Sequence, residues 1–98
     1  MDKNAVLAQL QLHREALQQR GILHAAVFGS VARGEAREDS DLDILIYMNP
    51  EIPMDIYAYT NVKRYIADLF PTTTDIVNQA ALKQGISIQA EQDAVYAF

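Results

Sequence analysis

The chain has 98 residues, of which half are hydrophobic, and its formal net charge at pH 7 is −5. This length leaves room for one hydrophobic core and excludes a second domain of any size, so we expect a single domain over residues 1–98. The sequence has no cysteine, which excludes disulfides and thiolate metal sites. No apolar run is long enough for a membrane span and no signal-like segment follows Met1, so we expect a cytoplasmic protein.

The basic residues are scattered along the chain rather than gathered in one segment. Proteins that grip nucleic acid need basic faces, because these displace counterions from the phosphates. We therefore expect no direct nucleic-acid binding. The negative net charge instead favours a protein acceptor with a basic surface.

Residues 4–20 predict the first helix. Its apolar residues recur at helical spacing, at Val6, Leu7, Leu10 and Leu17. Gly21 is suited to end this helix. His13 and His24 have no histidine or carboxylate neighbour at ligand spacing, so we expect neither to have a functional role.

A short apolar run from Leu23 to Phe28 predicts a buried strand that ends at a Gly-Ser pair. Gly29 has no Cβ, so the backbone there can turn sharply and let a phosphate come close. Ser30 supplies a hydroxyl and can cap the helical turn that follows, whose exposed N–H groups favour an anion. By itself, a Gly-Ser pair is more typical of a plain strand-to-turn connection.

Ten residues further on, two aspartates stand one residue apart in the segment DLDILI, residues 41–46. Its alternation predicts a strand with Asp41 and Asp43 on one face and aliphatic side chains on the other. Their Cα atoms would lie about 6.6 Å apart, given a rise of roughly 3.3 Å per residue. The two carboxylates repel each other unless a hard divalent ion such as Mg²⁺ neutralises them. A solvated edge strand would explain the alternation, but not the neighbouring Gly-Ser turn.

The segment from Pro53 to Phe70 predicts a second long helix with an apolar stripe, because proline suits a first helical turn. Pro71 ends it. Two of its tyrosines, Tyr57 and Tyr59, are candidates for a partner surface.

Thr72 to Val77 predicts a further strand. If this strand pairs beside the Asp41–Asp43 strand, Asp75 brings a third carboxylate to the same cluster. On local grounds alone, a lone strand aspartate is more often a strand-end or capping residue. Residues 79–93 predict a helix whose bounds are left open by Gly85, and residues 94–98 predict a last short strand.

The order of these features resembles the signature of the nucleotidyltransferase superfamily of polymerase-β type. That signature is Gly-Ser, about ten residues, Asp-x-Asp and a later third Asp, and it is matched by Gly29, Ser30, Asp41, Asp43 and Asp75. The segment GSVARGEAREDSDLDILI is most similar to the minimal nucleotidyltransferases, or MNT proteins. The alternating elements predict an α/β fold, and the resemblance implies a small mixed sheet with helices packed on one side.

The resemblance also implies roles for the matching residues. Asp41, Asp43 and Asp75 would be the catalytic carboxylates and would hold two Mg²⁺ ions. Gly29 and Ser30 would bind the phosphates of ATP. Arg33 and Arg37 follow the phosphate turn, and either could steady the triphosphate or lie at the surface without such a role.

MNT proteins commonly accompany a HEPN-domain toxin, a small helical ribonuclease. The resemblance therefore implies an antitoxin enzyme that transfers AMP from ATP to a tyrosine hydroxyl of that toxin and so inactivates it. Two alternatives stay open. The chain could neutralise its partner by binding alone, or it could modify a small molecule such as an aminoglycoside.

Overall fold

The computed structural model describes residues 2–37, 39–81 and 91–98. Its elements in chain order are α1 (Lys3–Leu12), α2 (Arg14–Gln19), β1 (Ile22–Phe28), α3 (Gly29–Ala32), β2 (Leu42–Met48), α4 (Ile56–Ala67), β3 (Thr74–Asn78), the 3-10 turn η1 (Gln79–Ala81) and β4 (Val95–Tyr96). The strands form one mixed sheet in the order β3-β2-β1-β4, in which only β2 and β3 run parallel.

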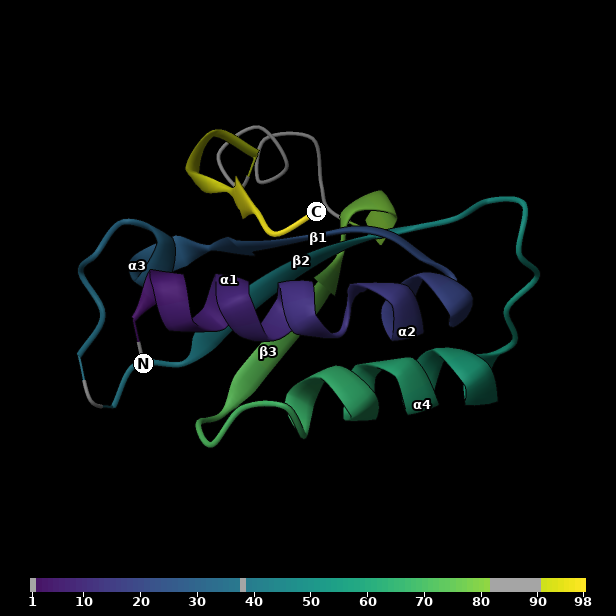
Figure 1. Cartoon of the computed structure of the whole chain (residues 1–98), viewed down its shortest axis with the longest axis horizontal. Helices are drawn as coiled ribbons and strands as arrows, with labels where there is room; N and C mark the ends of the chain where they lie inside the picture. The colour runs from purple at the N-terminus through teal and green to yellow at the C-terminus, as the bar shows by residue number, and fades with distance from the viewer. Residues whose placement is uncertain (1, 38, 82–90) are drawn as a thin grey trace.

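Helices α1, α2 and α4 cover one face of this sheet, and α3 lies at the end of β1 (Figure 1). The predicted α/β fold, with a small mixed sheet and its long helices on one side, is therefore confirmed. Within the described ranges, no helix is long and apolar enough to cross a membrane.

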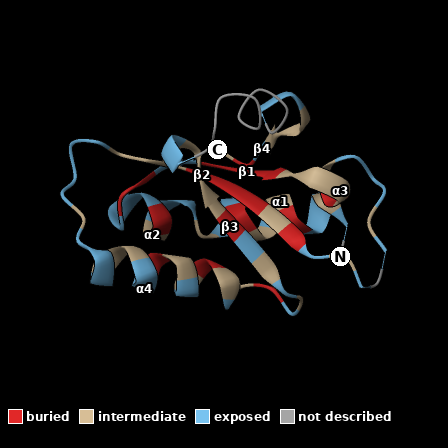
Figure 2. Ribbon diagram, turned by 180° about the vertical axis from the view of Figure 1, so that it is seen from behind, coloured by how far each residue is buried: buried red, intermediate tan, exposed pale blue. Residues whose placement is uncertain are grey.

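The hydrophobic core lies between the helical layer and the sheet, where buried residues line the facing sides of both (Figure 2). Leu42, Ile44 and Ile46 of β2 belong to it, as their alternation predicts. Leu45 is also fully buried, although it was expected on the carboxylate face, and so is its cross-strand neighbour Ala26. Both lie outside the main core cluster. The second face of the sheet is therefore covered at this point too.

The prediction of one continuous helix over residues 4–20 is wrong, because the helix is interrupted at His13. This residue has ψ 13° and separates α1 from α2. Its Nδ1 lies 2.8 Å from the hydroxyl of Tyr65 in α4, so a contact between distant segments accompanies the break. The periodicity of the apolar residues carried no sign of this contact.

The second long helix is shorter than the predicted segment from Pro53 to Phe70. It begins at Ile56, because the carboxylate of Asp55 accepts a hydrogen bond of 2.8 Å from the N–H of Ala58 and caps the helix there. Pro53 therefore lies before the helix rather than in its first turn.

All four strands agree with the sequence to within two residues at each end, and β4 is shorter than predicted. Asp41 immediately precedes β2, whereas Asp43 and Asp75 lie within β2 and β3. Most of the helix predicted over residues 79–93 lies outside the described residues, and its first three residues form η1.

Candidate active site

The sheet topology brings three strand ends together. Because β1 and β2 are antiparallel, the end of β1 lies beside the start of β2, and the parallel strand β3 starts at the same place. Asp43 is consequently the register partner of Phe28 on one side and of Asp75 on the other. The Gly-Ser turn that follows Phe28 therefore lies next to the candidate carboxylates.

Gly29 is in direct contact with this carboxylate group. Its φ is +73°, a conformation that favours glycine. A Cβ atom placed on Gly29 would lie 3.2 Å from Cγ and 3.4 Å from Cβ of Asp43, and closer still to a carboxylate oxygen. Glycine is thus required for its backbone conformation and for the space that Asp43 occupies. The Gly-Ser motif alone had predicted the sharp turn and the approach of a phosphate, but not the contact with Asp43.

Ser30 lies inside the first turn of α3, because the helix begins at Gly29 and its N-cap is Phe28. The expectation that Ser30 caps this turn is therefore wrong. Its backbone carbonyl accepts a hydrogen bond of 2.9 Å from the N–H of Glu35. Within the part of the chain that the structure describes, its hydroxyl has no hydrogen-bond partner, which leaves it able to bind a ligand.

The electrostatics of the site centre on Asp43, which is half-buried between its neighbours. Burial raises the pKa of its carboxyl group above the usual range, and the charges of Asp75 and Asp41 raise this pKa further. Arg33 opposes them and lowers the pKa of Asp43. Within the described residues, Arg33 is the one cation that lowers the pKa of Asp43, so the negative charge around this carboxylate is only partly compensated.

These donors fit a hard divalent cation. Among the residues that the structure describes, no group of three or more His, Cys, Asp or Glu side chains is close enough to hold an ion as a ready-made cage. Mg²⁺ does not need such a cage, because it keeps several of its waters and is usually bound by one or two carboxylates together with substrate phosphates. Carboxylates beside a phosphate-binding turn suit that manner of binding.

Arg33 lies close enough to influence Asp43, and it is held by two other acidic side chains. Its Nε donates to Glu35 at 2.9 Å and its Nη1 to Asp93 at 2.8 Å. Both bonds raise the pKa of its guanidinium group above the usual value. Asp93 is 60 residues away in the sequence, so no local motif could have predicted this partner.

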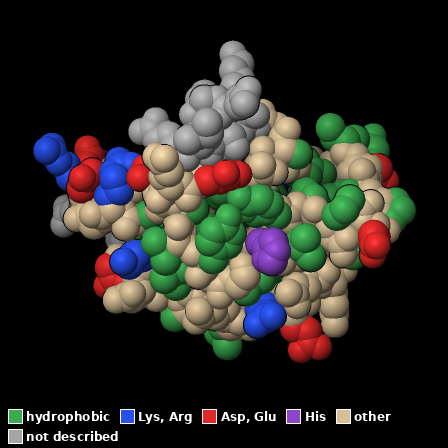
Figure 3. All heavy atoms as spheres, turned by 90° about the horizontal axis from the view of Figure 1, so that it is seen from above, with side chains coloured by type: hydrophobic (Ala, Val, Ile, Leu, Met, Phe, Trp, Pro, Cys, Tyr) green, Lys and Arg blue, Asp and Glu red, His purple; other side chains and the backbone are tan. Residues whose placement is uncertain are grey.

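The segment that carries Asp93 is anchored on the face of the sheet opposite the long helices, where a histidine side chain lies among hydrophobic side chains (Figure 3). There, Tyr96 donates a hydrogen bond of 2.9 Å to the hydroxyl of Tyr47, which in turn donates to Glu91. The ring of His24 meets both tyrosine rings edge-on. Burial and the bond from Tyr96 raise the pKa of Tyr47, which therefore stays protonated. This aromatic cluster fixes the segment whose Asp93 holds Arg33.

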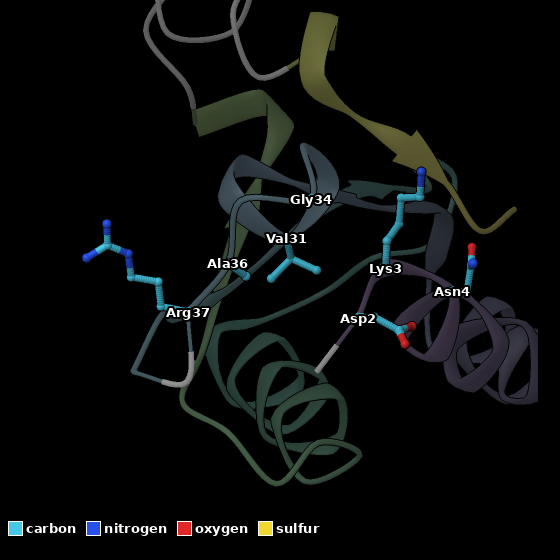
Figure 4. A pocket seen from close by; sticks show the side chains of 7 residues that line it. All are labelled: Asp2, Lys3, Asn4, Val31, Gly34, Ala36 and Arg37. Atoms are coloured by element: carbon cyan, nitrogen blue, oxygen red, sulfur yellow. The ribbon is translucent and has the colours of Figure 1, made fainter.

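Arg37, unlike Arg33, is not among the charges that shift the pKa of Asp43. It borders a hollow of about 440 Å³ between the start of α1 and the loop after α3, and its guanidinium extends away from the other lining side chains (Figure 4). It also borders a smaller hollow beside Ser40 and Pro71. Neither hollow is lined by Gly29, Ser30 or an aspartate of the candidate site. Of the two arginines, Arg33 is therefore the better placed to meet a triphosphate.

Comparisons with known proteins identify the family of this chain. Residues 10–97 match the model of the nucleotidyltransferase domain family. Over 88 residues, which cover 89% of this chain and 87% of the relative, the chain is 38% identical to the protein adenylyltransferase MntA of Thermococcus cleftensis. A solved structure described as a minimal nucleotidyltransferase matches with a TM-score of 0.71 at 34% identity, covering 97% of this chain and 95% of the other.

A second solved structure contains the tri-AMPylated HEPN toxin of Shewanella oneidensis in complex with its MNT antitoxin. It matches with a TM-score of 0.62 at 14% identity, covering 94% of this chain and 71% of the other, and this likeness is one of fold. The fold and the order of the candidate residues define a nucleotidyltransferase of the polymerase-β type. The chain belongs to the nucleotidyltransferase domain family and is a minimal nucleotidyltransferase.

Proposed function

We propose that this chain is an antitoxin enzyme that transfers AMP from ATP to a tyrosine hydroxyl of a HEPN-domain toxin. The observation that carries the proposal is the pairing of Asp43 with Asp75 on adjacent strands, beside the Gly-Ser turn that contacts Asp43. The names of similar proteins support this reaction and this acceptor, because one is a protein adenylyltransferase and another is an MNT antitoxin bound to an AMPylated HEPN toxin.

Gly29 and Ser30 would bind the β- and γ-phosphates of ATP. The backbone turns sharply at Gly29, and the hydroxyl of Ser30 is available to donate to a phosphate oxygen. Arg33 would add a positive charge close to the triphosphate. This requires its guanidinium to share or exchange its bonds with Glu35 and Asp93.

Asp41, Asp43 and Asp75 would hold Mg²⁺. When bound, the ions would neutralise charge on the triphosphate and help to activate the attacking hydroxyl. Asp43 is the least exposed of the three, so we assign it the central position. Asp41 and Asp75 are exposed and flank it.

Asp75 would also accept the proton of the acceptor. A tyrosine hydroxyl has a pKa of about 10 and is largely protonated at neutral pH, so its proton must leave as it attacks. The phenolic oxygen would form a bond to the α-phosphorus, and the bond from that phosphorus to the bridging oxygen would break. Pyrophosphate would then leave with the electron pair. Because β3 is the edge strand of the described sheet, an acceptor can approach Asp75 from outside it.

The proposal can be tested with ATP labelled at either the α- or the γ-phosphate, in the presence of Mg²⁺ and the HEPN-domain protein encoded beside this chain. We expect label to reach the HEPN-domain protein from the α-phosphate alone. Label transferred from the γ-phosphate would mean phosphorylation and would contradict the proposal. Absence of label from both, together with inhibition of the toxin, would mean that the chain acts by binding alone.

A further inference from the structure

Asp75 belongs to the candidate site and also lines a groove between α4 and β3, whose outer side pairs with no other strand among the described residues. Building on the function proposed above, we propose that this groove binds an extended, acidic segment of the acceptor protein and guides its tyrosine to the site. We call it the α4–β3 groove and define it by Tyr59, Lys63, Arg64, Thr74, Asp75 and Ile76, which line a hollow of about 560 Å³.

The edge of β3 is available for pairing. Within the described residues, β3 has β2 as its single strand neighbour, and α4 packs beside it (Figures 1 and 2). The N–H of Leu42 donates to the carbonyl of Thr73 at 2.9 Å, so the main-chain groups of Thr73 face β2. Because this direction alternates along a parallel ladder, Thr74 and Ile76 turn theirs outward. An extended peptide can bind such an edge through main-chain hydrogen bonds.

The charges in the groove favour an acidic occupant. Lys63 and Arg64 both line it, and Asp75 is the one carboxylate among its lining residues. In the described part of the chain, neither cation has a carboxylate within salt-bridge distance, and the Nζ of Lys63 lies 5.5 Å from the centre of the Tyr59 ring. The groove is thus locally basic in a chain whose net charge is −5. The groove therefore favours an acidic acceptor segment, whereas the net charge of the chain alone predicts an acceptor with a basic surface.

The groove continues into an apolar hollow at the far end of β3. Ile56 and Tyr59 line both hollows, and the second also includes Ile52, Met54 and Asn78. Ile56 is 73% exposed although it is a large aliphatic residue. An exposed aliphatic side chain that lies in a cluster of apolar side chains typically marks a surface that a partner covers. The expectation that Tyr59 contributes to a partner surface agrees with its place between the two hollows.

The order of these features specifies the occupant. Helix α4 ends near the start of β3, so Arg64 lies towards Thr74 and Asp75, whereas Ile56 lies towards Asn78. A segment bound along the edge would therefore place a tyrosine at Asp75, acidic residues beside Lys63 and Arg64, and apolar residues at Ile56. Nucleic acid fits this arrangement poorly, because two cations are followed by an apolar surface rather than by further positive charge.

The test compares a charge reversal in the groove with a matched reversal elsewhere. Lys63→Glu with Arg64→Glu should raise the KM for the HEPN-domain protein about tenfold, since two exposed ion pairs are lost, while kcat and the Kd for Mg-ATP remain unchanged. Lys3→Glu with Arg14→Glu changes the net charge by the same amount outside the groove and should leave KM unaltered. Lys63→Arg with Arg64→Lys keeps the charge and should keep the KM.

A second variant addresses the strand edge itself. Thr74→Pro removes an outward N–H and leaves the bonds to β2 in place, so it should also raise KM and the Kd for the HEPN-domain protein. Circular dichroism and the Kd for Mg-ATP establish that the variant is folded. An unchanged KM in both Thr74→Pro and the charge reversal would overturn the proposal.

The outcome separates this inference from the function on which it rests. If the wild-type chain transfers no AMP, the proposed function fails, and the Kd between the HEPN-domain protein and the variants still tests the groove. A charge reversal that alters self-association of the chain, with the acceptor Kd unchanged, would assign the groove to a second copy. Loss of oligonucleotide binding instead would assign it to nucleic acid, and either result overturns an acceptor groove.

Discussion

Asp43 and Asp75 are register partners on adjacent parallel strands, and the charge of Asp75 raises the pKa of Asp43. In a parallel ladder, register partners present their side chains on the same face of the sheet. The repulsion between these two carboxylates is therefore built into the pairing of β2 with β3. Because this repulsion opposes folding, we assign the two carboxylates a role in binding a ligand rather than in stabilising the fold.

The raised pKa of Asp43 predicts how stability depends on pH. Asp43 binds its proton more tightly in the folded than in the unfolded chain, so its contribution to the free energy of unfolding falls as pH rises from the ordinary aspartate pKa through the raised one. Asp75→Asn removes one cause and should lower the pKa of Asp43. NMR titration of the Asp43 carboxyl group measures this directly. An unshifted pKa would mean that the two charges are not coupled.

Asp75→Asn also tests catalysis. We expect it to abolish transfer, because the amide cannot accept the proton of the acceptor, while the chain still folds and still binds the HEPN-domain protein. The rate of AMP transfer and the Kd for the HEPN-domain protein distinguish these effects. A fully active variant would confine the catalytic carboxylates to Asp41 and Asp43.

Gly29→Ala should destabilise the fold and abolish transfer, because the new Cβ would overlap the Asp43 carboxylate. Gly34→Ala is its control, since Gly34 has the same φ of +73° but no atom of the described residues within 4 Å of the position that a Cβ would occupy. The control should lose about 1 kcal/mol from the strained backbone alone, and Gly29→Ala clearly more. Chemical denaturation measures both, and equal losses would show that Gly29 is needed only for its φ.

Binding of ATP or a non-hydrolysable analogue should require Mg²⁺ or Mn²⁺. Without the ion, the triphosphate would meet three carboxylates of the same sign of charge. Calorimetry with and without excess chelator measures this dependence. Equal affinity under the two conditions would remove the metal-bridged mode of binding.

Arg33→Ala should weaken the binding of Mg-ATP about tenfold, as expected for the loss of a charge-assisted contact. Arg37→Ala is the matched control, and it should have no such effect because Arg37 lines hollows that include none of the candidate carboxylates. Calorimetric Kd values for the two variants decide between them. A larger loss of Mg-ATP affinity in Arg37→Ala than in Arg33→Ala would exchange the roles of the two arginines.

The local pattern of the sequence was sufficient for the sheet strands and for the neighbourhood of Gly29, Asp43 and Asp75. Alternation gives the faces of β2 and β3, and the resemblance to a known family supplies their place in one site. What local patterns could not contain were contacts between distant residues. The break at His13 accompanies its contact with Tyr65, and the ion pair of Arg33 depends on Asp93.

The start of α4 was misplaced for a different reason. Pro53 and Asp55 both suit the beginning of a helix, and periodicity does not rank them. In the folded chain the side-chain bond of Asp55 decides, because it satisfies an N–H of the first turn that Pro53 could not. The role of Ser30 was misread similarly, since the helix starts one residue earlier than a serine cap requires.

The measurement that tests the central claim most directly is the intact mass of the HEPN-domain protein after incubation with this chain, ATP and Mg²⁺. We expect an increase by whole multiples of one AMP residue, carried on tyrosine, and no increase with Asp41→Ala combined with Asp43→Ala. The same double variant should fail to protect cells from the toxin even where it still binds it. An unmodified toxin alongside full protection would contradict the catalytic function and leave binding alone as the mechanism.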